Sequence, residues 1–156
     1  MNIWNRSTRI PEIYGTLIFL GLLVYFFVMY AAGLIHVIEL RLVNLFIMLA
    51  GVYFAIKQYR RTHDGHINYF RALAAGTSSA VIGTSTFALF LFLFLKFEGN
   101  LMESIQQNEA LGPYLNPYIA SFMVFLEGIF SGFGLTYLLV NWIDTDHVAE
   151  PIGEAQ

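Results

Sequence analysis

Residues 72–95 read ALAAGTSSAVIGTSTFALFLFLFL and carry no charged side chain. A helix needs about 20 apolar residues to cross the hydrocarbon core of a bilayer, so this stretch predicts a transmembrane helix. Its first half is small and hydroxylated, whereas its second half is bulky and apolar. Because small residues let helix backbones approach closely in lipid, we expect the first half to pack against other helices.

Three further apolar runs, at 13–35, 37–56 and 118–143, also predict transmembrane helices. The first follows two arginines, as a signal peptide would, but it is longer than the apolar region of about 7–15 residues in such peptides, and we interpret it as a membrane span. The chain is 57% hydrophobic and 12% charged, whereas soluble domains carry about 25% charged residues. We therefore predict an all-α fold, in which residues 1–156 form a single membrane domain built as a four-helix bundle.

The basic residues indicate the orientation of this bundle. Arg6 and Arg9 precede the first predicted span, and a basic loop joins the second to the third. Cytoplasmic loops of membrane proteins are enriched in lysine and arginine. We therefore predict that both termini are cytoplasmic. The basic loop contains Lys57, Arg60, Arg61 and Arg71.

The stretch from Asn100 to Leu111 is polar but periodic. Leu101, Ile105 and Leu111 fall on one helical face, and glutamates and glutamines occupy the other. We predict a short amphipathic helix at the outer membrane interface, between the third and fourth spans. A plain loop is the alternative.

Small residues recur every four positions in the third and fourth predicted spans. In lipid this spacing is typical of helix–helix contacts, within one chain, against a second copy or against a partner protein. A substrate path lined by hydroxyl groups is the alternative interpretation. The predicted helix-packing residues are Gly76, Ala80, Gly83, Gly128 and Gly132.

Glu127 lies inside the fourth predicted span, where a carboxylate costs about 2.5–3.5 kcal/mol to insert at the helix centre. At a rise of 1.5 Å per residue it sits roughly 13 Å from the outer end of its span, and Thr84 sits about 16 Å from the same surface. We therefore expect an intramembrane polar cluster that joins the helices by hydrogen bonds or handles protons or cations. The predicted cluster is Glu127, Thr84, Ser85, Thr86 and Arg41.

Other candidates for chemistry are weaker. His63, Asp64 and His66 are metal-ligand types, but Asp-Gly is a turn signal and three ligands on one tight turn converge poorly on an ion. All four histidines lie near span ends or in loops, so we expect no haem at mid-membrane. The chain has no cysteine, which excludes disulfides and thiolate metal sites on it. We expect no cofactor, and a net charge of −3 without a basic stripe argues against nucleic acid.

The basic end of the second span, then Asp64-Gly65, then the segment INYFRA at 67–72 leading into a glycine-containing span, form a further pattern. In these features and in its four-span layout, the whole chain resembles a family of uncharacterised four-span bacterial inner-membrane proteins, a domain of unknown function found mainly in Bacteroidetes. The resemblance implies an architecture but no activity.

The sequence shows no nucleophile–base pair, no phosphate-binding loop and no sizeable soluble domain. We therefore expect a non-enzymatic structural or accessory protein that packs with itself or with a larger membrane complex. The alternative is a small oligomeric transporter or ion-translocating protein that uses Glu127 and the hydroxyls of the third span. A water-accessible cavity reaching Glu127 would favour transport, whereas packed side chains around it would favour a scaffold.

Overall fold

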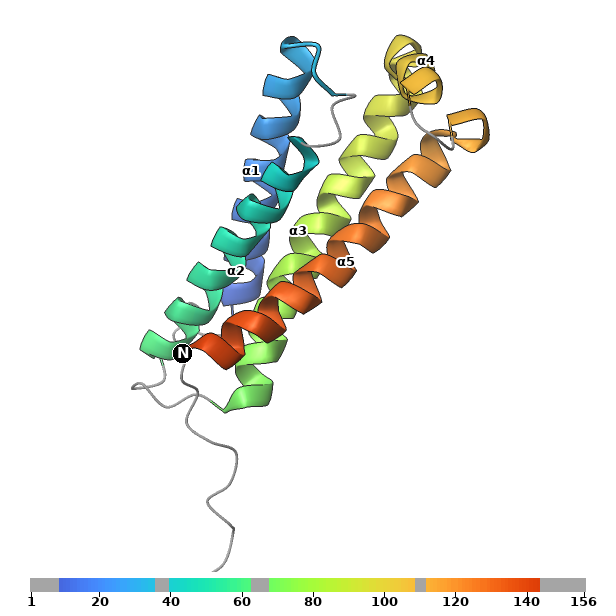
Figure 1. The fold of residues 1–156 in the computed structure, drawn as a ribbon. Helices are drawn as coiled ribbons and strands as arrows, with labels where there is room; N and C mark the ends of the chain where they lie inside the picture. Colours follow the sequence, from blue (N-terminus) through green and yellow to red (C-terminus); the bar gives the residue numbers. More distant parts are fainter. Residues whose placement is uncertain (1–8, 36–39, 63–67, 109–111, 144–156) are drawn as a thin grey trace, which may run out of the picture.

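The computed structural model describes residues 9–35, 40–62, 68–108 and 112–143. Within these ranges the chain forms helices and no strand, and four of the helices are long and apolar enough to cross a membrane. The predicted all-α fold is confirmed, and the chain is a multi-pass membrane protein. The elements (Figure 1) are α1 (Ile10–Ala31), α2 (Arg41–Thr62), α3 (Tyr69–Phe97), α4 (Gly99–Asn108), the 3₁₀ turn η2 (Gly112–Tyr114) and α5 (Pro117–Trp142).

Helix α1 ends at Ala31, four residues before the end of the predicted span. Gly33 has a φ of 69°, in the left-handed region. The Gly33 N–H donates to the Tyr30 carbonyl at 3.1 Å, and the Leu34 N–H donates to the Met29 carbonyl at 3.0 Å. This is the Schellman arrangement, which satisfies the last carbonyls of a helix and turns the chain away.

Helix α2 is shifted toward the C-terminus relative to the predicted 37–56, because it starts at Arg41 and continues to Thr62. Residues 36–39 lie outside the described ranges. The added turn contains Arg60 and Arg61, both exposed. Cations near a helix C-terminus interact favourably with the helix dipole, so these polar residues extend the helix beyond its apolar part.

Asparagine caps begin both long helices of the second half. The Asn68 side chain accepts a hydrogen bond from the Phe70 N–H at 3.0 Å, and the Asn116 side chain accepts one from the Ile119 N–H at 2.9 Å. Such caps satisfy backbone donors that a helix start leaves open. Between these helices, the stretch predicted to be amphipathic forms α4, with Leu101 and Met102 buried. Its last predicted residues, 109–111, lie outside the described ranges.

Helix α3 is the central element, in contact with α1, α2, α4 and α5. Its contact with α5 is an antiparallel seam in which a glycine of one helix faces a residue with a side chain on the other. A Cβ built on any glycine of this seam would overlap the residue opposite. The seam therefore holds the two backbones close by shape, as small residues do in membrane helix pairs. Its pairs are Gly76 with Thr136, Ala80 with Gly132, and Thr84 with Gly128.

The two halves of α3 contact α1 differently. In the first half, Gly83 lies against Ile18 and the Gly15 carbonyl of α1, so the backbones approach closely. In the second half, aromatic rings fill the space, and the Phe94 ring lies 5.2 Å from the Phe26 ring and 5.4 Å from the Tyr30 ring, between centroids. Large rings hold helices further apart than glycines do, so the sequence of α3 sets a splayed geometry.

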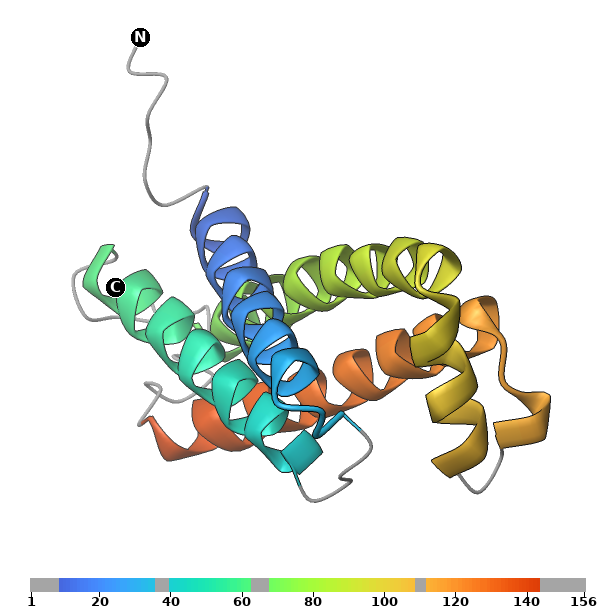
Figure 2. The same ribbon diagram turned by 90° about the horizontal axis from the view of Figure 1, so that it is seen from above.

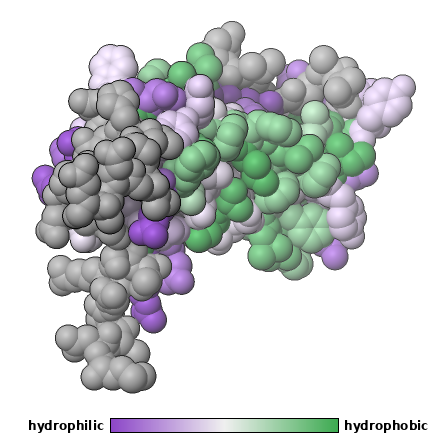
Figure 3. All heavy atoms as spheres, turned by 90° about the horizontal axis from the view of Figure 1, so that it is seen from below, coloured by the Kyte–Doolittle hydropathy of each residue, from purple (hydrophilic) through white to green (hydrophobic). Residues whose placement is uncertain are grey.

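The splay is visible in both ribbon views. Toward the end that carries α4, the pair α1 and α2 separates from the pair α3 and α5 (Figures 1 and 2). On the outside, hydrophobic side chains cover much of the face shown in Figure 3, with hydrophilic residues toward its edges. Large hydrophobic side chains of α5, such as Phe130, Phe133 and Leu138, are exposed. The fold thus presents apolar residues to lipid and opens at one end.

Candidate functional site

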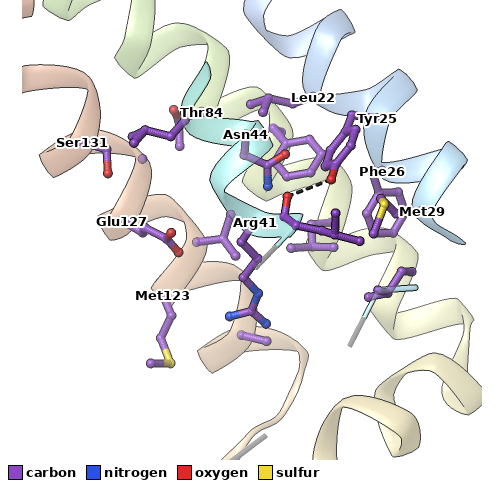
Figure 4. Close-up of a pocket in the computed structure, with 18 of the residues that line it drawn as sticks. Leu22, Tyr25, Phe26, Met29, Arg41, Asn44, Thr84, Met123, Glu127 and Ser131 are labelled. Atoms are coloured by element: carbon purple, nitrogen blue, oxygen red, sulfur yellow. Dashed lines mark hydrogen bonds between the residues drawn. The ribbon is translucent and has the colours of Figure 1, made fainter. Parts of the chain in front are cut away.

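The separation of the two helix pairs leaves a cavity of about 1030 Å³, here called the α2–α5 cavity (Figure 4). Its walls come from α1, α2, α3 and α5, and Ile105 of α4 and Leu115 close the end nearest α4. Arg41, Leu42, Met123 and Glu127 all line it and are all exposed. The cavity therefore opens between α2 and α5.

Most of the cavity wall is apolar. Leu22 and Phe26 of α1 form one side, and Leu91 and Leu95 of α3 form the back. Leu91 and Leu95 belong to a cluster that also contains Leu101, Met102 and Leu115, so α4 is tied to this end of the bundle by buried side chains. The Gln106 side chain also donates to the Leu115 carbonyl at 2.8 Å, which joins α4 to the segment before α5. The cavity is thus an apolar space that is closed at the α4 end and open at its side.

Charged groups enter this apolar space from two opposite walls. Figure 4 shows Arg41 extending from α2 and Glu127 from α5, both toward the cavity. Asn44 lies one turn from Arg41, and Ser131 lies one turn from Glu127, and both line the same space. Among the residues described as lining it, Arg41 and Glu127 are the two that carry a formal charge. Their charges are opposite, so the formal charge of the described lining is zero.

The structure brings together three members of the predicted polar cluster, because Arg41, Thr84 and Glu127 line one cavity. Ser85 and Thr86 are not among its lining residues. Thr86 is exposed, and its hydroxyl donates to the Ile82 carbonyl of its own helix at 2.8 Å. Thr84, Ser85 and Thr86 are consecutive and so point in three directions from a helix, which brings only one of them to the cavity.

The Thr84 hydroxyl differs from two other buried hydroxyls of α3 and α5, those of Ser79 and Thr136. The Ser79 hydroxyl donates to the Ala75 carbonyl at 2.8 Å, and the Thr136 hydroxyl donates to the Gly132 carbonyl at 2.6 Å. Thr84 is 2% exposed, and its hydroxyl makes no hydrogen bond within the described part of the chain. The hydrogen bond expected between Glu127 and this hydroxyl is therefore not formed. A buried hydroxyl without a partner costs free energy, so Thr84 provides an unused polar group beside the cavity.

Three polar lining residues are absent from the predicted cluster: Tyr25, Asn44 and Ser131. Asn44 and Ser131 stand three and four positions after Arg41 and Glu127, a spacing that places them on the same helix faces and would have identified them. Tyr25 carries no such signal. Its hydroxyl donates to the Leu40 carbonyl at 2.7 Å, which joins α1 to the start of α2 at the rim (Figure 4).

The predicted basic loop and packing residues lie elsewhere. Lys57, Arg60, Arg61 and Arg71 are exposed at the end of the bundle opposite α4, and the Lys57 ammonium lies 5.5 Å from the centroid of the Tyr53 ring. The packing residues all lie in contacts between helices of the same chain. His63, Asp64, His66 and the other histidines fall outside the described ranges, and within those ranges no group of three metal-ligand side chains gathers.

A family model described as "Protein of unknown function (DUF4199)" matches residues 13–111, more than half of the chain. The match covers most of α1 and all of α2, α3 and α4, and therefore includes the α2 and α3 walls of the cavity. No curated protein and no solved structure matches the chain.

Proposed function

The chain belongs to the DUF4199 family of proteins of unknown function, and from its cavity we propose that it is a non-enzymatic accessory protein of the bacterial inner membrane that binds a small amphiphilic ligand between α2 and α5. In this proposal the protein holds its ligand without transforming it. It acts alongside a second copy or a larger membrane complex.

The α2–α5 cavity carries this proposal. Ligand pockets are concave, largely apolar spaces of about 300–1,000 Å³ with a few placed polar groups, and they occur between the helices of bundles. The cavity has a volume of about 1030 Å³, with one guanidinium, one carboxylate and one unpartnered hydroxyl around it. Its side opening between two membrane helices gives a molecule dissolved in the bilayer a direct route of entry.

The location and partners rest on two further observations. Four exposed basic residues gather at the end of the bundle opposite α4, which by the distribution of charge in membrane proteins is the cytoplasmic side. Both termini then lie on that side. The small-residue seams are occupied within the chain, so a partner would contact lipid-facing side chains such as Phe130, Phe133 and Tyr137 of α5.

A cavity-filling variant tests the ligand proposal. Ala120 lines the cavity, so Ala120→Phe places a ring inside it. Ala50 is exposed and is not among the lining residues, so Ala50→Phe is the matched control. We expect mass spectrometry of the gently purified protein to find a bound small molecule with the wild type and the control, and to lose it with Ala120→Phe. Equal occupancy in all three proteins would contradict the proposal.

Ion or proton translocation is the second candidate, favoured by the exposure of the Glu127 carboxylate at the cavity opening. Purified protein in proteoliposomes loaded with a pH-sensitive dye would then dissipate an imposed proton gradient. Glu127→Gln would abolish this flux, because a side-chain amide does not take up and release protons near neutral pH. Flux equal to that of protein-free vesicles would remove this candidate and leave the binding proposal in place.

A further inference from the structure

We propose that the ligand of the α2–α5 cavity is a zwitterionic phospholipid with a primary ammonium group, its phosphate on Arg41 and its ammonium on Glu127. This inference rests on the proposed binding function and adds the chemical class of the ligand and its orientation.

The charge pattern selects the head group. Arg41 and Glu127 reach the cavity from α2 and α5, and no other residue described as lining it is formally charged. An anionic lipid would complement the charge of Arg41 but place excess negative charge beside the Glu127 carboxylate. A cationic amphiphile would do the reverse. Because charges in a low-dielectric environment interact strongly, a head group with both signs matches this pair best.

The donor chemistry fits the same assignment. A guanidinium presents five N–H donors in a planar fork, so Arg41 can bind a phosphate and keep other contacts. An ammonium presents three N–H donors, which a carboxylate accepts as charge-assisted hydrogen bonds. Asn44 and Ser131, one turn along from the two charged residues, line the space around such a head group. Thr84 adds the buried hydroxyl that has no partner in the described chain.

The apolar part of the cavity accommodates the lipid tail. On the side away from α4, toward the middle of the bundle, the cavity wall continues along Leu22, Met48 and Phe87. These side chains are apolar, and an acyl chain has no hydrogen-bonding group that they would leave unpaired. A head group alone would leave this surface uncovered, so we expect the tail to be required for binding.

The opening determines the route. Met123 and Leu42 are 46% and 59% exposed beside Glu127 and Arg41, so the two charged residues lie next to exposed apolar side chains at the opening between α2 and α5. A lipid can enter from the bilayer with its head between the two helices.

The test is native mass spectrometry of the full-length protein in an equimolar mixture of phosphatidylethanolamine and phosphatidylglycerol. We expect the wild type to retain phosphatidylethanolamine about tenfold over phosphatidylglycerol, the size of one charge-assisted hydrogen bond. Glu127→Gln should remove this preference, and Arg41→Gln should weaken retention of both lipids. Glu12→Gln, which changes an exposed carboxylate in the first turn of α1, should retain the wild-type preference.

Further arms separate the possible failures. Phosphatidylcholine carries the same charges without N–H donors on its cation, so it should bind less than phosphatidylethanolamine, and free phosphoethanolamine should not bind. Equal retention of both test lipids, unaffected by Glu127→Gln but lost in Ala120→Phe, would overturn the head-group assignment and leave the binding proposal standing. Retention that Ala120→Phe does not change, or a protein or neutral molecule as the occupant, would overturn the lipid assignment itself.

Discussion

At the scale of single residues, Gly128 shows how tightly the seam between α3 and α5 is built. A Cβ at this position would overlap the Thr84 side chain, whereas a Cβ at Gly134 on the same helix would meet nothing within 4 Å. We expect Gly128→Ala to lower the free energy of unfolding by about 1–3 kcal/mol, the usual cost of overpacking. Thermal unfolding in one detergent measures this loss.

Two variants sharpen the test at this seam. Gly134→Ala should leave stability unchanged or raise it by up to about 1 kcal/mol, since alanine favours helix over glycine. Gly128→Ala combined with Thr84→Gly should recover part of the loss, because the side chain that occupied the space is gone. If the double variant is less stable than Gly128→Ala alone, the two residues do not compete for one space.

For Glu127 the sequence predicts the depth in the membrane but not the side-chain contacts. Its depth and the level of Thr84 follow from counting residues along helices, and both residues line one cavity. Counting could not show that Thr84 packs on Gly128 and leaves its hydroxyl without a partner. That outcome depends on the rotation of two helices about their own axes, which a four-residue spacing does not specify.

At the scale of elements, the end of α1 is set by backbone conformation alone. Gly33 adopts a φ of 69°, and a Cβ there would meet nothing within 4 Å. A residue with a side chain in this conformation costs about 1–2 kcal/mol. We expect Gly33→Ala to lower the unfolding temperature, and Gly33→Asn to lower it less, because asparagine tolerates left-handed backbone better. Equal effects of both substitutions would point to a cause other than backbone strain.

Helix ends also show which signals a sequence contains. Hydropathy alone extends the first span to residue 35 and starts the second at 37, since it measures apolar content and ignores capping. The observed ends at Ala31 and Thr62 follow from the Gly33 turn and from arginines that extend α2 past its apolar part. The asparagine caps before α3 and α5 are readable in advance, because Asn68 and Asn116 directly precede their helices.

At the scale of the whole molecule, orientation in the membrane is the next prediction. Because the chain has no cysteine, single cysteines can be introduced without a background. Arg61 at the end of α2 and Gln107 in α4 are both exposed and lie at opposite ends of the bundle. We expect a membrane-impermeant maleimide to label Gln107→Cys in intact spheroplasts, and Arg61→Cys only after permeabilisation. The reverse labelling pattern would show that the orientation is opposite to the predicted one, and it would not bear on the fold.

The arrangement of helices is the part that hydropathy could not supply. Four apolar stretches predict four spans, and their small residues predict close packing, but each apolar face is an equally good neighbour for lipid or for another helix. The seam between α3 and α5 and the contact between α3 and α1 arise from which small residue meets which larger one. The cavity exists only once these contacts are set, so it has no signature in any single segment.

The splay of the two helix pairs has a mechanical consequence. A body wider at the α4 end than at the other is a wedge, and in the proposed orientation its broad side occupies the outer leaflet. A bilayer adapts to the shape of a protein at a modest elastic cost, and this cost falls where the membrane already curves toward the broad side.

We expect the protein, reconstituted in that orientation, to be enriched in small, strongly curved vesicles over large ones, which co-flotation with size-sorted vesicles would measure. Equal distribution would indicate that lipid, and not curvature, takes up the difference in width. Enrichment in the small vesicles would make membrane shape a physical input to which this small bundle responds.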